Sequence, residues 1–154
     1  MRVRPAEPDD EAFVVRLVPR FVEHGAADGH TADEVIEGTS RVMRDALRAP
    51  REGDVFLVAE DDDGVPAGFV YGTLESDFFT NEPYLHVSEI AVTRSGSGIG
   101  AAMMAAVEEV ALARGYRFVT LNVVEENRPA QRFYERLGFG PEHRHYVKRI
   151  ASSE

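Results

Sequence analysis

Length, composition and charge limit the kind of protein that this chain can form. Its 154 residues, of which 44% are hydrophobic and 29% charged, indicate one globular domain over residues 1–154 with enough chain to bury a core. The absence of cysteine excludes disulfides, thiolate metal sites and a cysteine nucleophile. A net charge of −10 argues against a general nucleic-acid binder. The same charge would attract a cationic substrate, although solubility alone is the simpler explanation.

The hydrophobic pattern points to neither a membrane protein nor an exported one. No apolar run approaches the length of a membrane-spanning helix. The N-terminus, residues 1–5, lacks the apolar stretch of a signal peptide. We therefore expect a cytoplasmic protein without a membrane partner.

The first half of the chain predicts two helices and then a hairpin. Apolar residues recur at helical spacing between Phe13 and Phe21, and Pro19 is expected to stop or kink that helix. Thr31 and Glu34 have the spacing of a capping box, which begins a second helix. Two apolar runs then flank an Asp-Gly turn, a pattern typical of a β-hairpin. The expected elements are a strand over residues 2–4, helices over 8–21 and from 31 to about 48, and strands over 55–59 and 68–74.

The second half mixes strands and helices without strict alternation, which favours a mixed sheet in an α+β or α/β domain. Gly115 is expected to cap the end of the first helix of this half. Pro129 stands in the first turn of the next helix and Gly138 follows its end, the usual asymmetry. The expected elements are a strand over residues 84–92, a helix to about 114, a strand over 118–124, a helix over 128–137 and a final strand over 146–150.

The loop after the strand over residues 84–92 is the most informative segment. It reads Ser-Gly-Ser-Gly-Ile-Gly-Ala over residues 95–101, and a run of strong helix formers follows. We expect that none of these three glycines, which stand at alternate positions, serves packing, and that their bare N–H groups point outward where the helix begins. Such a helix N-terminus binds anions, above all phosphate. The sequence therefore predicts a phosphorylated ligand.

Two known phosphate-binding motifs fit this loop less well. The run from Gly96 to Ala101 satisfies the dinucleotide fingerprint G-x-G-x-x-G/A, and the acidic pair Glu125 and Glu126 follows near the place of a ribose-binding carboxylate. Only 28 residues remain after Glu126, however, too few for the remaining strands of a nucleotide-binding half. A P-loop is excluded because no Gly-Lys-Ser/Thr follows the glycines.

A second motif narrows the choice of ligand. Residues 127–139 read Asn-Arg-Pro-Ala-Gln-Arg-Phe-Tyr-Glu-Arg-Leu-Gly-Phe. With the glycine loop upstream, this closely resembles the Gcn5-related N-acetyltransferase (GNAT) superfamily, whose members show Asn-x-x-Ala-x-x-Phe-Tyr-x-x-x-Gly-Phe at this place. The resemblance covers about residues 84–139 and implies a central mixed, mostly antiparallel sheet flanked by helices. It also implies an enzyme that transfers the acetyl group of acetyl-CoA to a primary amine, by direct attack in a ternary complex.

The resemblance further implies how the donor binds. Loop N–H groups would hold the pyrophosphate, and the pantetheine arm would bond to the strand like an added strand, with an N–H near Ile90 or Ala91 polarising the thioester carbonyl. The family has Gln or Arg where Ser95 stands, which leaves Arg94 as the candidate cation. Asn127 would bond the pantetheine amides, cap the helix, or both. The implied donor-binding residues are Ile90, Ala91, Val92, Gly96, Ser97, Gly98, Ile99, Gly100, Ala101, Asn127 and Tyr134.

Proton transfer has three candidate side chains. Tyr134 would supply a proton or a hydrogen bond to the departing thiolate; the alternative is a packed aromatic, with Phe133 facing the core. An ammonium with a pKa of about 10.4 cannot attack until a proton is removed. Glu89 is the first candidate for that base, directly or through a water, and its alternative is a pairing or substrate-binding carboxylate. His86, with an unperturbed pKa of about 6.5, is the other candidate base.

Several questions stay open from the sequence. The acceptor amine could belong to a polyamine or aminoglycoside, an amino acid, a peptide N-terminus or a protein lysine. Rival functions are a non-catalytic CoA-binding sensor or interaction domain and a dinucleotide binder, and a homodimer rests on family habit alone. Phe78 and Phe79 would cover the core or line a substrate pocket. We expect no metal, because Asp61–Asp63 lack the later ligands of a calcium loop and His143 and His145 lack a third ligand.

Overall fold

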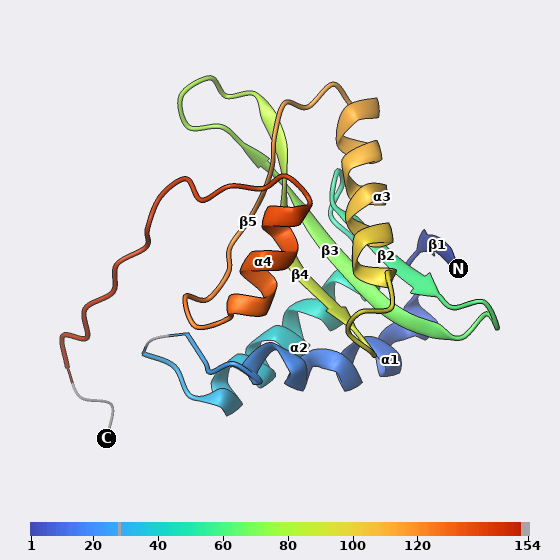
Figure 1. Cartoon of the computed structure of the whole chain (residues 1–154), viewed down its shortest axis with the longest axis horizontal. Coiled ribbons are helices and arrows are strands. Elements are labelled where there is room, and N and C mark those ends of the chain that lie inside the picture. The colour runs from blue at the N-terminus through green and yellow to red at the C-terminus, as the bar shows by residue number, and fades with distance from the viewer. Residues whose placement is uncertain (28, 152–154) are drawn as a thin grey trace.

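The computed structural model describes residues 1–27 and 29–151, and Figure 1 shows its elements in chain order. The strands are β1 (Arg2–Pro5), β2 (Val55–Glu60), β3 (Pro66–Ser76), β4 (Pro83–Val92) and β5 (Val119–Leu121). The helices are α1 (Glu11–Leu17), α2 (Ala32–Arg48), α3 (Ile99–Ala113) and α4 (Arg128–Arg136), with short 3₁₀ helices over Pro8–Asp10 and Val18–Val22.

The strands form one mixed sheet. Within the described residues its order is β1-β2-β3-β4-β5; the first four strands pair antiparallel, and β5 lies parallel to β4. Two parallel neighbours need a long crossover connection, and α3 provides it. The predicted mixed, mostly antiparallel sheet flanked by helices is therefore confirmed.

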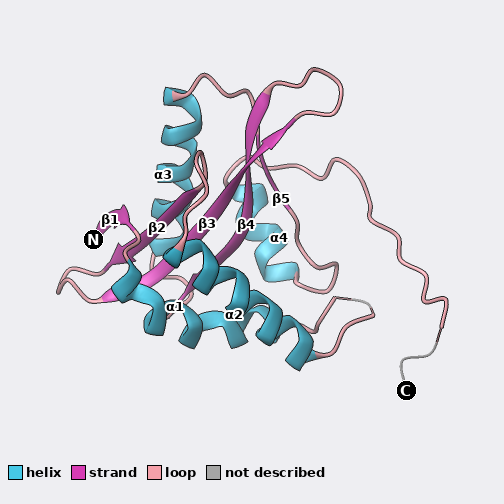
Figure 2. Ribbon diagram, turned by 180° about the vertical axis from the view of Figure 1, so that it is seen from behind, coloured by secondary structure: helices cyan, strands magenta, loops and turns pink. Residues whose placement is uncertain are grey.

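Helices cover both faces of the sheet (Figure 2). On one face, α3 buries Met103 and Val107, and α4 packs its aromatic side chains against the same core. On the other face, α1 and α2 bury Val14 and Met43 beside Phe69 of β3. The helices α1, α2 and α3 thus bury apolar side chains against the sheet, and α4 packs partly buried ones there, which is the usual way in which such layers are stabilised.

A bulge in β4 shapes the half of the strand that matters for function. Tyr71 lies opposite Glu89 and Gly72 lies opposite Val87, so Ser88 is the extra residue in β4. A bulge increases the local twist and bends the strand that carries it. Pairing between β4 and β5 ends at Val87, so the following residues of β4 have a free edge toward β5.

Two elements are shorter than the sequence predicted, for different physical reasons. The helix expected over residues 8–21 is divided: α1 ends at Leu17, and Val18–Val22 form a 3₁₀ helix with Pro19 in its first turn. Proline has no N–H for the α-helical ladder, and a 3₁₀ turn accommodates that loss at a helix end. β5 is only 3 residues long, because its pairing with β4 stops there.

The prediction of a final strand over residues 146–150 is wrong. Residues 140–150 have no regular structure, and Tyr146 and Ile150 are 84% and 87% exposed. Figure 1 shows this segment leading away from the body of the protein. Strand-forming residues alone are not sufficient, because a strand needs a hydrogen-bonded neighbour, and none of the described strands pairs with this segment.

Candidate active site

The glycine loop turns the chain from β4 into α3. Gly96 and Gly98 have φ angles of 75° and 82°, a left-handed conformation that favours glycine. The first hydrogen bond of α3 runs from the Ala102 N–H to the Gly98 carbonyl at 3.1 Å. The N–H groups of residues 99–101 therefore precede the helical ladder and have no partner within it. With the helix dipole behind them, they form an N-terminus suited to an anion.

Ser97 stabilises the loop from within. Its Oγ donates a hydrogen bond to the Arg94 carbonyl at 2.9 Å. The hydroxyl is thereby engaged by the loop itself, so the group that Ser97 can offer to a ligand is its backbone N–H. Arg94 and Ser95 are both exposed.

Gly100 has a packing role that contradicts the sequence interpretation. A Cβ atom at this position would lie 3.2 Å from Cζ of Phe133. That separation is tighter than ordinary van der Waals contact, so the missing side chain lets α4 pack closely against α3. The expectation that none of the three glycines serves packing is therefore wrong for Gly100.

Two residues of β4 turn their backbone groups toward the free edge. The Thr93 N–H donates to the Ala67 carbonyl at 2.8 Å, so the backbone of Thr93 faces β3. The direction of the backbone N–H and C=O groups alternates along a strand. Those of Ala91 therefore also point toward β3, whereas those of Ile90 and Val92 point to the side that β5 no longer covers. Of the three predicted strand residues, Ala91 thus uses its backbone inside the sheet, and its side chain lies in the core under α1 and α2.

Glu89 stands next to the bulge and opposite Tyr71. The Glu89 carboxylate makes no hydrogen bond or ion pair with the described residues. Since no fully buried side-chain nitrogen or oxygen among those residues lacks a partner, the carboxylate oxygens must be in contact with solvent. Partial burial disfavours the charged carboxylate and raises the pKa of Glu89 to about 7. A carboxyl group with this pKa is well matched to general-base catalysis near neutral pH.

Tyr134, the predicted catalytic acid, lies on α4. Its ring packs edge-on against Phe133 and Phe139, with centroid separations of 5.1 and 5.9 Å. Burial, and secondly the charge of Glu89, raise the pKa of Tyr134 to about 12. The phenol is therefore protonated at neutral pH and able to donate. Because the charge of Glu89 acts on this pKa, the two predicted catalytic side chains lie within electrostatic range of each other.

Asn127 and His86 each have a structural partner. Asn127 caps α4, because its Oδ1 accepts a hydrogen bond from the Ala130 N–H at 3.2 Å. His86 Nδ1 lies 2.8 Å from Oγ1 of Thr120, which links β4 to β5. Burial lowers the pKa of His86, and Glu75 partly opposes this effect. The imidazole is therefore neutral at pH 7, with one of its nitrogens engaged by the threonine.

Comparison with known families assigns the fold that carries this site. A family model described as the acetyltransferase (GNAT) family matches residues 22–139. The chain belongs to the GNAT family. The matched region includes the free half of β4, the glycine loop and α4, and therefore all the predicted donor-binding and catalytic residues. No curated protein matches the chain.

Solved GNAT structures share this fold at low sequence identity. A GCN5-related N-acetyltransferase from Ralstonia eutropha has a TM-score of 0.76 and 19% identity, over 97% of this chain and 99% of that one. An aminoglycoside N-acetyltransferase in complex with CoA has a TM-score of 0.70 and 18% identity, over 98% of this chain and 95% of that one. A ribosomal-protein-alanine N-acetyltransferase from Brucella melitensis has a TM-score of 0.70 and 18% identity, over 97% of this chain and 100% of that one.

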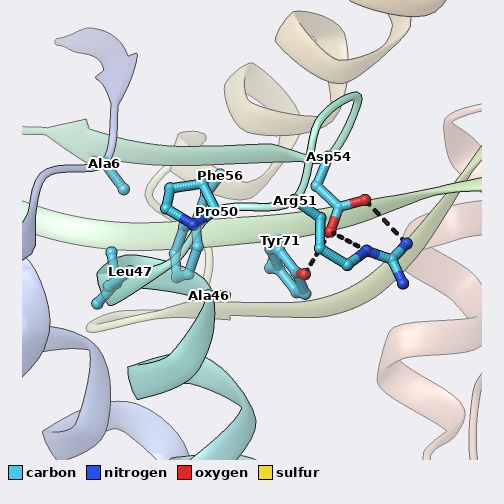
Figure 3. Close-up of a pocket in the computed structure, with 8 residues that line it drawn as sticks. All are labelled: Ala6, Ala46, Leu47, Pro50, Arg51, Asp54, Phe56 and Tyr71. Carbon is cyan, nitrogen blue, oxygen red and sulfur yellow. Dashed lines mark hydrogen bonds and ion pairs between the residues drawn. The ribbon is translucent and has the colours of Figure 1, made fainter.

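A buried acidic group lies on the α2 side of the GNAT sheet and carries no sequence signal. The Asp54 side chain is 4% exposed and forms an ion pair with Arg51 at 3.2 Å. It also accepts hydrogen bonds from the Tyr71 hydroxyl at 2.7 Å and the Leu74 N–H at 2.9 Å. Burial and then Asp54 raise the pKa of Tyr71, so its hydroxyl stays a donor. Arg51, Asp54 and Tyr71 help to line a cavity of about 190 Å³. Figure 3 shows how these three side chains lie together.

The remaining candidates from the sequence lie away from this site. Phe78 and Phe79 are 92% and 89% exposed and contact each other edge-on at 5.3 Å, so neither covers the core. The exposed His143 lies 3.7 Å from Glu142. Among residues 1–27 and 29–151 there is no group of three side chains that could hold a metal ion. None of the helices found there is long and apolar enough to cross a membrane.

Proposed function

We propose that this protein is an acetyl-CoA-dependent N-acetyltransferase that acts on a primary amine by direct attack in a ternary complex. One observation carries the proposal: Glu89 of β4 and Tyr134 of α4 lie within electrostatic range of each other. Their raised pKa values suit a base and an acid at the same pH. Membership of the GNAT family supports the same reaction.

The residues present fit a donor of the CoA type. The N–H groups of residues 99–101 suit its pyrophosphate, and the backbone groups that Ile90 and Val92 present along the edge not covered by β5 suit the amides of an extended pantetheine arm. A CoA complex is among the solved structures with this fold, which agrees with that fit. Acetyl-CoA would supply the activated acetyl group, and the Ile90 N–H would stabilise negative charge on its carbonyl oxygen.

Glu89 is the proposed base. An alkylammonium group with a pKa of about 10.4 must lose a proton before its nitrogen can attack a carbonyl carbon. With a pKa of about 7, the Glu89 carboxylate accepts that proton more readily than an ordinary carboxylate would, directly or through a water. His86 fits this role less well, because its Nδ1 is engaged by Thr120 and burial lowers its pKa.

Tyr134 is the proposed acid. After the new C–N bond forms and the C–S bond breaks, the departing thiolate needs a proton or a hydrogen bond. The phenol of Tyr134 is protonated at neutral pH and makes no hydrogen bond with the side chains and backbone that the structure describes, so it is free to donate to the sulfur. The ring contacts with Phe133 and Phe139 fix its direction.

The surface beyond Glu89 favours a cationic acceptor. Thr73, His86 and Thr120 lie side by side across three strands, and Glu75 lies near His86, on the same sheet face as Glu89. Polar side chains and a carboxylate are suited to binding an ammonium group before it reacts. Solved relatives named for aminoglycosides and for a ribosomal protein cover both small-molecule and polypeptide amines. The proposal extends to both kinds of acceptor.

The experiment that tests this function is release of free thiol from acetyl-CoA across a panel of polyamines, aminoglycosides and peptides. We expect amine-dependent thiol release by the wild type, and a 10- to 100-fold lower kcat, roughly, for Tyr134→Phe with little change in the KM for acetyl-CoA. Tyr146→Phe, which alters an exposed tyrosine far from the site, is the matched control. Tight CoA binding without thiol release from any amine would instead indicate a non-catalytic CoA-binding domain.

A further inference from the structure

Arg20 makes a contact that the sequence did not indicate. It lies in the 3₁₀ helix Val18–Val22 that follows α1, and its Nη1 donates a hydrogen bond to the carbonyl of Val92, the last residue of β4. Its Nε lies 3.3 Å from Oε1 of Glu23. The guanidinium is therefore held between the N-terminal helices and the end of the strand that precedes the glycine loop.

The Val92 carbonyl is one of the backbone groups on the free edge of β4. Thr93 bonds to β3 through Ala67, so by strand alternation the carbonyl of Val92 points the other way. It is the last acceptor on that edge before the chain enters the loop over residues 93–98. Arg20 thus occupies the acceptor that stands between the proposed sites of the pantetheine arm and the pyrophosphate.

The chemistry of a guanidinium makes this position significant. Arg20 uses two of its five donors on Val92 and Glu23, and its Nη2 makes no hydrogen bond within residues 1–27 and 29–151. Hydrogen bonds from arginine to phosphate are charge-assisted and often bidentate, and they are stronger than a bond to a neutral carbonyl. The adjacent loop carries Ser95 where the GNAT pattern has a longer polar or cationic side chain.

We propose that Arg20 is a phosphate ligand for the donor. In the free protein it holds the Val92 carbonyl; when the donor arm takes up that edge of β4, the guanidinium turns to a donor phosphate and supplies the positive charge that Ser95 lacks. The inference rests on the proposed function only in that the donor is CoA-like, and it requires no knowledge of the acceptor amine.

Binding of two ligands that share one arm tests this role. Titrations would compare CoA, which carries phosphates, with pantetheine, which carries none. Arg20→Gln is expected to raise the Kd of CoA by about tenfold or more, the size expected for a charge-assisted hydrogen bond, and to leave the Kd of pantetheine unchanged or lower. Arg16→Gln is the matched control, since Arg16 lies on the same segment with its guanidinium over the Phe13 ring, and it should bind both ligands as the wild type does.

Glu23→Gln guards against a folding defect in the first variant. It keeps the Arg20 guanidinium and removes its anionic partner, so CoA should bind more tightly while pantetheine is unaffected. Equal weakening of CoA and pantetheine in Arg20→Gln would show that Arg20 only supports the strand, and an unchanged CoA affinity would show that it has no part in binding. Either result overturns the proposal, while acetyl transfer by the wild type would still uphold the proposed function.

Discussion

At the scale of single residues, the position of Glu89 and its pKa have the same origin. The bulge at Ser88 changes the alternation of β4, which places Glu89 opposite Tyr71 and beside the core under α1 and α2. Burial there raises the pKa of Glu89 to about 7 without an ion pair to offset it. A carboxyl group that remains unpaired in a half-buried position destabilises the fold, which is typical of groups kept for chemistry.

The rate of acetyl transfer is expected to follow the ionisation of Glu89. Since the base must be ionised, kcat/KM should rise with pH through about 7 and then level off. Glu89→Gln should remove this step and lower kcat on the order of 10²- to 10⁴-fold. Steady-state kinetics between pH 5.5 and 9 would check both, with His86→Asn as the comparison; if that variant lost the pH dependence and Glu89→Gln kept it, the base would be His86.

The ionisation of Glu89 that activates the base should also make the folded protein less stable. Between pH 4.5 and about 7 the folded protein holds a proton on Glu89 that the unfolded chain releases, so this group lowers the free energy of unfolding as pH rises through that window. The full penalty, roughly 3 kcal/mol at most, applies above pH 7. Glu89→Gln should therefore unfold at higher urea than the wild type at pH 8 and equally at pH 4. A gain of the same size at both pH values would contradict this assignment.

At the scale of elements, the sequence indicated most helices and strands but not their ends. Capping residues marked α2 and α4 clearly, because Thr31 and Asn127 act locally and both caps are present. The length of β5, by contrast, depends on how far it pairs with β4, which local sequence does not encode. For the same reason, the strand-like residues near Tyr146 predicted a strand that has no described neighbour to pair with.

Gly68 tests how closely α3 must lie on the sheet. A Cβ atom at Gly68 would come within 2.9 Å of the Met103 side chain and 3.0 Å of the Ala91 backbone carbonyl. The carbonyl belongs to the β ladder and cannot move aside, so Gly68→Ala should destabilise the fold by about 1–3 kcal/mol through overpacking. Gly140→Ala, at a position with open space around it, should change the free energy of unfolding by no more than about 0.5 kcal/mol. Equal urea midpoints for the two variants would show that α3 can shift freely.

At the scale of the whole molecule, the site is an assembly of segments that lie far apart in the chain. Tyr134 belongs to a recognisable motif and Glu89 to the strand that precedes the glycine loop, so sequence alone could nominate them. Arg20 and Asp54 belong to none: packing of the N-terminal helices on the sheet brings Arg20 to β4, and Asp54 reaches β3 because it directly precedes β2, which pairs with β3. The backbone direction of Ala91 was equally hidden, because it follows from strand pairing and not from residue type.

Donor binding should stabilise the protein as a unit, because the donor would contact both β4 and the N-terminus of α3. At a hundredfold excess over its Kd, a ligand specific for the folded state raises the free energy of unfolding by about 2.7 kcal/mol. A melting experiment with acetyl-CoA, CoA and NAD in parallel should show Tm increases for the first two and none for NAD. A higher Tm with NAD alone would instead support the interpretation of the glycine loop as a dinucleotide-binding site.

The free edge of β4 has a further consequence for how the protein behaves at high concentration. An unpaired strand edge on the outside of a sheet invites other chains to add to it, and this leads to aggregation. Here the edge lies between two strands of one sheet, with β5 still attached at Leu85–Val87 and α4 packed nearby. A whole strand from another protein would have to displace those elements, whereas a slender extended ligand need not. The free edge of β4 can therefore bind a narrow extended ligand while a full β-strand from another protein is excluded.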